Sequence, residues 1–107
     1  MKKCTPCETG KGALTLAEAR KKLKNVKPFI LVKDKMPKIR RDYKFKNFKD
    51  AMKFANKVAV VAEKSMHHPD ILLFRWNNVR IEIYTHSMNG LSAYDFMLAK
   101  EINKIKV

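Results

Sequence analysis

The chain has 107 residues, a length typical of one domain. Hydrophobic residues make up 46% of it and charged residues 32%, which is too much apolar material for a disordered chain. Its longest apolar run, residues 58–62, is far shorter than the roughly 20 residues of a membrane-spanning helix, so we expect no membrane span. No apolar segment follows Lys2 and Lys3, so we expect no secretory signal.

The charge is strongly unbalanced, because 24 Lys and Arg against 10 Asp and Glu give a net charge of +14. Such an excess attracts polyanions without identifying one. A basic nucleic-acid-binding module is therefore an alternative to an enzyme, although a lysine-rich solvated surface explains the same charge and nucleic acid is not the expected partner. The residues that such a module would use are Arg40, Arg41, Arg75 and Arg80.

The domain prediction is an irregular N-terminal arm at 1–13 and a single domain at 14–107. The arm contains Cys4-Thr5-Pro6-Cys7, a spacing found in redox motifs and in half of a zinc site, but a second cysteine pair is missing. Two cysteines fit a reducing compartment. We expect the cytoplasm, with the nucleus as the alternative.

Three segments carry the signals that begin a helix. Each opens with a polar residue followed three positions later by an acidic one: Thr15 with Glu18, Asn47 with Asp50, and Ser92 with Asp95. In the second segment, apolar residues at spacings of three and four predict one buried stripe. That stripe comprises Phe48, Ala51, Met52, Ala55, Val58, Ala59 and Ala62.

Between these helices the apolar pattern changes to a period of two, which is typical of strands. Strands are expected at 29–32, 39–46, 71–76 and 79–85, and Asn77-Asn78 suits a two-residue hairpin turn between the last two. The predicted fold is α+β, in the order α-β-β-α-β-β-α. It has a four-stranded antiparallel sheet with three helices packed on one face.

The predicted turn sets a register for the last hairpin. Trp76 would pair with Val79, Phe74 with Ile81 and Leu72 with Ile83, all on the core face. The same register places Pro69 opposite His86. All three histidines, His67, His68 and His86, would then converge at one end of this hairpin.

Two carboxylates accompany these histidines. Glu63 precedes His67 by one helical turn, and Asp95 opens the last helix. Imidazoles beside a carboxylate can supply both an acid and a base near neutral pH, since the pKa of a free imidazole is about 6.5. A purely structural cluster is the alternative. A zinc site is a weaker one, because adjacent histidines rarely face the same metal.

These residues resemble the signature of the pterin-4a-carbinolamine dehydratases. The likeness covers residues 14–105 and rests on Glu63, His67, His68, Pro69, Trp76, His86 and Asp95. It implies a hydro-lyase that dehydrates 4a-hydroxytetrahydropterin to quinonoid dihydropterin, in tetrahydrobiopterin recycling. It also implies no metal or organic cofactor, and assembly as a homodimer or homotetramer. One departure is Met66, where many relatives have an acidic residue.

The resemblance also implies roles for individual residues. His67 and His86 would carry out the acid and base steps, and His68 would complete the catalytic set by orienting the pterin. Glu63 and Asp95 would set the tautomer and charge of the imidazoles. The predicted substrate-binding residues are His68, Pro69 and Thr85. Some members of the family also act as transcriptional partner proteins, an activity that the motif itself does not imply.

Overall fold

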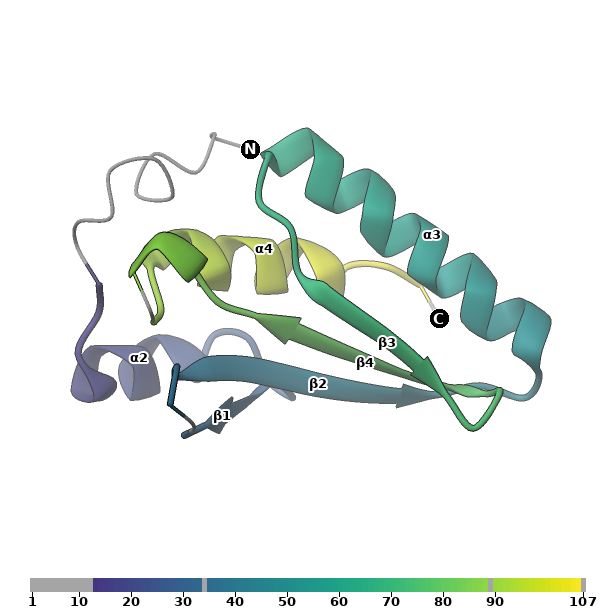
Figure 1. The fold of residues 1–107 in the computed structure, drawn as a ribbon, viewed down its shortest axis with the longest axis horizontal. Coiled ribbons are helices and arrows are strands. Elements are labelled where there is room, and N and C mark those ends of the chain that lie inside the picture. The colour runs from purple at the N-terminus through teal and green to yellow at the C-terminus, as the bar shows by residue number, and fades with distance from the viewer. Residues whose placement is uncertain (1–12, 34, 89, 107) are drawn as a thin grey trace.

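The structure is a computed structural model that describes residues 13–33, 35–88 and 90–106. Cys4 and Cys7 lie outside the described residues, as does the predicted arm apart from Ala13. The elements follow the predicted order α-β-β-α-β-β-α (Figure 1). They are α2 (Leu16–Leu23), β1 (Ile30–Val32), β2 (Lys38–Lys44), α3 (Phe48–Ser65), β3 (Asp70–Phe74), β4 (Asn78–Ile83), the short 3-10 helix η1 (His86–Met88) and α4 (Ala93–Asn103).

The four strands form one antiparallel sheet in the order β1-β2-β4-β3 (Figure 1). Central strands β2 and β4 pair Ile39 with Ile83 and Tyr43 with Val79. Along β4, Val79, Ile81 and Ile83 are fully buried, while the residues between them are partly exposed. Helices α2, α3 and α4 pack on this apolar face, α2 beside β1, and α3 and α4 against β4 and against each other. The predicted α+β fold is therefore confirmed.

Two helix starts show why the local signals succeeded. The Thr15 hydroxyl accepts a hydrogen bond from the Glu18 N–H at 3.1 Å, and the Glu18 carboxylate accepts one from the Thr15 N–H at 2.9 Å. Asn47 Oδ1 accepts from the Asp50 N–H at 2.7 Å. Each contact satisfies an N–H that the first helical turn leaves unpaired, so residues three positions apart are enough to define the start.

The predicted apolar stripe on α3 is wrong in part, because the helix presents two apolar rows. The buried row comprises Ala51, Phe54, Val58 and Ala62. Phe48 and Met52 are 52% and 42% exposed, and Ala59 is exposed as well. At about 100° per residue the two rows lie roughly a quarter turn apart, so one sheet cannot cover both.

The predicted turn of the last hairpin is wrong. Arg75, Trp76 and Asn77 form the connection, and Phe74 pairs with Asn78. Arg75 and Trp76 adopt left-handed backbone, with φ of 49° and 56°. Asn77 is tied to Phe45 at the end of β2: its carbonyl accepts the Phe45 N–H at 2.8 Å and its side-chain amide donates to the Phe45 carbonyl at 2.8 Å. This distant contact holds the turn at residues 75–77 instead of at the predicted 77–78.

The corrected register exchanges the two faces of β3. Leu73 lies opposite Val79 and Ile71 opposite Ile81, so both lie on the core side of the sheet. Leu73 packs against the core there, whereas Ile71 at the edge of the sheet is 38% exposed. Leu72 and Trp76 are 51% and 60% exposed, contrary to the prediction that they are buried. Phe74 pairs with Asn78 instead of with Ile81, and this register shift of three residues moves Leu72 from a predicted core position to the surface.

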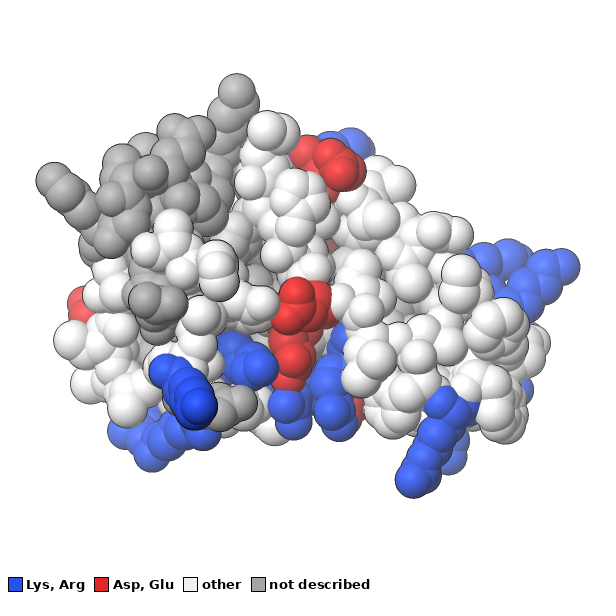
Figure 2. Space-filling model, in the orientation of Figure 1, with Lys and Arg blue, Asp and Glu red and all other residues white. Residues whose placement is uncertain are grey.

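Charged side chains on the other face of the sheet are largely paired. Arg40 binds Glu82 through Nε at 2.7 Å, and Arg80 binds Asp42 at 2.9 and 3.1 Å. Figure 2 shows acidic and basic side chains meeting near the middle of the molecule, with uncharged surface between them and the basic right-hand end. On the core side of the sheet, Arg41 lies opposite Ile81 and donates to Asn103 Oδ1 of α4 at 2.7 Å. Most of the arginines considered for nucleic-acid binding therefore have partners within the chain. No described helix is long and apolar enough to cross a membrane.

Candidate active site

The end of α3 directs the two adjacent histidines to opposite sides. Met66 adopts left-handed backbone with φ of 58°, and its N–H bonds to the carbonyls of Ala62 and Glu63. The hydroxyl of the buried Ser65 lies 3.3 Å from the His67 carbonyl oxygen. His67 consequently turns inward and is 5% exposed, whereas the side chain of His68 is 58% exposed.

A buried carboxylate lies at the centre of the site. Asp95, in the first turn of α4, is fully buried. Its Oδ2 accepts hydrogen bonds from the Ser92 N–H at 2.7 Å and from the Thr85 hydroxyl at 2.9 Å, and its Oδ1 contacts His67 Nε2. Three donors therefore replace the water that this carboxylate loses on burial.

These contacts determine which groups donate a hydrogen bond and which accept one. Because Asp95 Oδ1 acts as an acceptor, Nε2 of His67 carries the hydrogen of that contact. A neutral imidazole then has its lone pair on Nδ1. The Thr85 hydroxyl donates to Asp95, so the Ser92 hydroxyl, 2.9 Å away, donates to Thr85 Oγ1. The result is a chain of hydrogen bonds from Ser92 to the imidazole of His67.

Three elements bring this network together. His67 follows α3, Thr85 follows β4, and Asp95 belongs to α4. Asp70 pairs with Glu82, and the same register continued three residues further would place His67 opposite Thr85. His86 begins η1 directly after Thr85 and is exposed. The Thr85 N–H bonds to the Gly90 carbonyl at 2.7 Å and closes the loop that carries His86.

Glu63 lies beside a different histidine from the one that its spacing predicted. Its Oε1 is 3.4 Å from Nε2 of His68, and the two side chains are 75% and 58% exposed. The prediction paired Glu63 with His67 through one helical turn. It fails because the left-handed Met66 ends the helical periodicity just before His67.

The remaining predicted site residues are not all near the histidines. Pro69 is half-buried directly before β3. Trp76 lies in the turn beyond the other end of that strand. Thr85 is 1% exposed, and its hydroxyl, its N–H and its carbonyl oxygen all form hydrogen bonds within the chain, so its contact with substrate stays a prediction. Ser65, whose hydroxyl lies 3.3 Å from the His67 carbonyl oxygen, was not predicted as a residue of the site. No sequence signal marks a serine at a helix end for such a contact.

Metal binding was also considered for this site. Within the described residues, no group of three or more His, Cys, Asp and Glu side chains is arranged to hold a metal ion.

Comparison with known proteins identifies the family. A family model described as pterin 4 alpha carbinolamine dehydratase matches residues 12–105. A Methylococcus capsulatus protein bearing the family name is 41% identical over 104 residues, 97% of this chain and 90% of that protein. Pterin-4-alpha-carbinolamine dehydratase 2, mitochondrial, of Arabidopsis thaliana is 41% identical over 108 residues, 99% of this chain and 58% of that longer protein.

A solved structure is similar as well. The crystal structure of a transcriptional coactivator/pterin dehydratase from Brucella melitensis superposes with a TM-score of 0.77 at 33% identity, covering 86% of this chain and 96% of that one. The family match spans nearly the whole chain, and the fold agrees with it. This chain therefore belongs to the pterin-4a-carbinolamine dehydratase family and is a hydro-lyase.

Proposed function

We propose that the protein removes water from 4a-hydroxytetrahydropterin to form quinonoid dihydropterin, by histidine acid–base catalysis in the recycling of tetrahydrobiopterin. The C4a–O bond breaks as the hydroxyl accepts a proton and leaves as water. N5 loses its proton, and the C4a–N5 double bond forms. The reaction needs one acid and one base and no net redox change. The observation that carries the proposal is the buried His67–Asp95 pair in a chain of this family.

His67 is assigned one of the two proton transfers. Its Nε2 is directed at Asp95, and the imidazole held in this way would exchange a proton with the pterin. The Asp95 carboxylate would stabilise the imidazolium that forms when the ring accepts this proton. A well-placed acid or base of this kind accelerates a reaction by about 10²–10⁴-fold.

His86 and His68 are assigned the complementary tasks. Both are exposed, so a pterin can reach them from solvent. His86 would carry out the second proton transfer. His68, with its neighbour Glu63 at 3.4 Å, would orient the pterin ring beside Pro69. Thr85 and Ser92 would act through Asp95 by holding its carboxylate in place.

The test follows the ultraviolet absorbance of freshly generated 4a-hydroxytetrahydropterin in a stopped-flow instrument. The wild-type protein should exceed the spontaneous rate, and His67→Gln and His86→Gln should each lower kcat by about 100-fold. Lys64→Gln, an exposed change in the last turn of α3, is the control and should keep the wild-type rate. Wild-type turnover no faster than the spontaneous reaction would refute the activity. Full turnover by both histidine variants would refute the mechanism alone.

We also propose that the protein assembles as a homodimer or homotetramer. β3 is at the edge of the sheet, and its apolar residues Ile71 and Leu72 are 38% and 51% exposed. An open, apolar edge strand favours pairing with another chain. Light scattering after size exclusion should give a multiple of 12.5 kDa, and Leu72→Lys should shift the population toward monomer. A wild-type protein that stays monomeric at high concentration would refute this assembly.

A further inference from the structure

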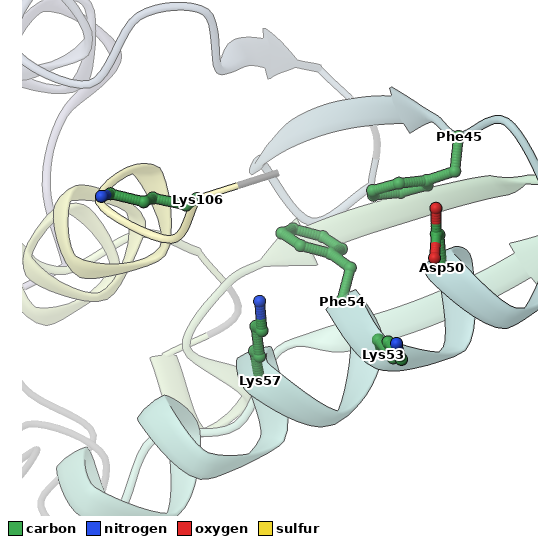
Figure 3. A pocket seen from close by; sticks show the side chains of 6 residues that line it. All are labelled: Phe45, Asp50, Lys53, Phe54, Lys57 and Lys106. Atoms are coloured by element: carbon green, nitrogen blue, oxygen red, sulfur yellow. The ribbon is translucent and has the colours of Figure 1, made fainter.

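A cavity of about 230 Å³ lies at the other end of α3 from the histidine site (Figure 3). It lies between the first turns of α3, the residue that follows β2, and the tail that follows α4. Its lining comprises Phe45, Asp50, Lys53, Phe54, Lys57 and Lys106. None of these residues has a part in the dehydration chemistry proposed above.

Aromatic rings form one side of this cavity. The centroids of Phe45 and Phe54 are 5.3 Å apart with their planes tilted by 37°, and Tyr43 packs behind Phe54 with its centroid at 4.3 Å. Phe54 and Tyr43 are buried, which holds the group in place. A rigid ring surface of this kind favours flat ligands, because aromatic faces stack without requiring a particular hydrogen-bond pattern.

Three lysines give the cavity a basic side. Lys53 and Lys57 lie one turn apart on α3, and Lys106 lines the cavity from the tail with its ammonium group pointing away from Phe54 and Lys57 (Figure 3). Lys46 and Lys104 nearby pair with Asp50 and Glu101, but among the described residues these three cavity lysines form no ion pair. Like charges one helical turn apart repel, so an anion bound between them would relieve an unfavourable interaction.

The polar groups are separated along the cavity. In Figure 3 the Asp50 carboxylate lies beside Phe45, whereas the Lys57 ammonium group points into the open space between Phe54 and the tail that carries Lys106. A ligand that matches this order has an N–H or amino group at one end, a flat ring in the middle and an anionic group at the other end. The volume is below the roughly 300–1,000 Å³ of pockets for drug-sized ligands, so part of the ligand would remain outside.

We propose that this cavity binds a nitrogen heterocycle that carries an anionic group, the class to which nucleoside monophosphates belong. The ring would stack on the half-buried Phe45, which the buried Phe54 supports. The phosphate would bind Lys57, with Lys53 one turn away adding to the positive potential, and ring amino hydrogens would face Asp50. This site is independent of the dehydratase site and does not rest on the proposed function.

The test is a calorimetric titration at fixed ionic strength with adenosine 5′-monophosphate, adenosine and inorganic phosphate. The nucleotide should bind at least about tenfold more tightly than either half, because it alone uses both the rings and the lysines. The double variant Lys53→Gln/Lys57→Gln should weaken nucleotide binding by at least about tenfold. Phe45→Leu should weaken binding of the nucleotide but not that of phosphate.

The matched control is Lys49→Gln/Lys64→Gln, which removes the same charge from exposed positions of the same helix outside the cavity. It should change nucleotide affinity by less than about twofold. Equal weakening by the two double variants would mean general attraction to a basic surface and would overturn the proposal. Phosphate binding as tight as nucleotide binding, or no binding of the nucleotide at millimolar concentration, would overturn it as well.

Discussion

His67 and His68 are neighbours in the chain and each lies beside a carboxylate, but their surroundings differ sharply. In the His67–Asp95 pair the side chains are 6% and 0% exposed, whereas in the His68–Glu63 pair they are 58% and 75% exposed. Water competes for every hydrogen bond of the exposed pair, which limits the worth of such pairs to about 0–1 kcal/mol. Water cannot reach the buried Asp95 carboxylate, so each group that donates a hydrogen bond to it is needed to replace that water. Adjacency to a carboxylate therefore does not give two histidines the same chemistry.

Of the substitutions that test this difference between the two pairs, those of Asp95 should have the largest effect. Asp95→Ala leaves the donors of His67, Thr85 and Ser92 without their acceptor, so the free energy of unfolding should fall by about 3–5 kcal/mol in urea denaturation. Asp95→Asn keeps the shape and an acceptor, and it should fold while kcat falls by about 100-fold. Wild-type turnover by the folded Asn variant would contradict the role given to this carboxylate.

Substitution of Thr85 should have a smaller effect than substitution of Asp95. Thr85→Val preserves the branched shape but removes the hydroxyl that donates to Asp95 at 2.9 Å. We expect the free energy of unfolding to fall by about 1–2 kcal/mol and kcat to fall by several-fold with KM unchanged, since the residue acts through Asp95. Thr85→Ser retains the hydroxyl and is the matched control, which should keep kcat close to wild type. An increase in KM alone would instead indicate direct contact with substrate.

Glu63→Gln removes the same charge as Asp95→Asn, but from the exposed pair. The free energy of unfolding should change by less than about 0.5 kcal/mol, because the pair is solvated on both sides. Turnover should stay within about threefold of wild type. A loss of kcat as large as that of Asp95→Asn would show that exposure is not what separates the two pairs.

Asp42 extends the comparison to a surface pair far from the histidines. Hydrogen bonds from Arg80 hold the pKa of Asp42 below its ordinary value of 3.8. A carboxyl whose pKa is lower in the folded state stabilises the fold above its unfolded pKa and loses that contribution as pH falls through the folded pKa. Asp42→Asn should therefore cost up to about 1 kcal/mol at pH 7, and the difference in the free energy of unfolding should shrink below about pH 4. A difference independent of pH would contradict this.

The sequence predicted best what depends on close neighbours. The starts of α2, α3 and α4 follow from residues three positions apart, and the alternation in β4 identified Val79, Ile81 and Ile83 as core positions. These features need no information about the rest of the chain. The helix and strand order followed from them.

Contacts between distant segments were not predictable in the same way. In the sequence Asn77 is an ordinary turn residue, but its hydrogen bonds to Phe45, 32 positions away, shift the turn of the hairpin. Glu63 lies beside His68 instead of His67 because Met66 adopts a left-handed backbone. Methionine gives no signal in the sequence for that conformation. The three histidines were predicted from the sequence as candidates, whereas the histidine that lies beside each carboxylate became clear only from the fold.

The most direct test of the central claim is the imidazole tautomer of His67, read from its ¹⁵N chemical shifts by NMR near pH 8, where a free imidazole is neutral. Our account predicts that the hydrogen is held on Nε2 of His67 and that Asp95→Asn removes this preference. His68 should instead exchange between tautomers, with or without Glu63→Gln. A hydrogen on Nδ1 of His67, or tautomer exchange in His67 like that of His68, would contradict the claim that the buried carboxylate sets its chemistry.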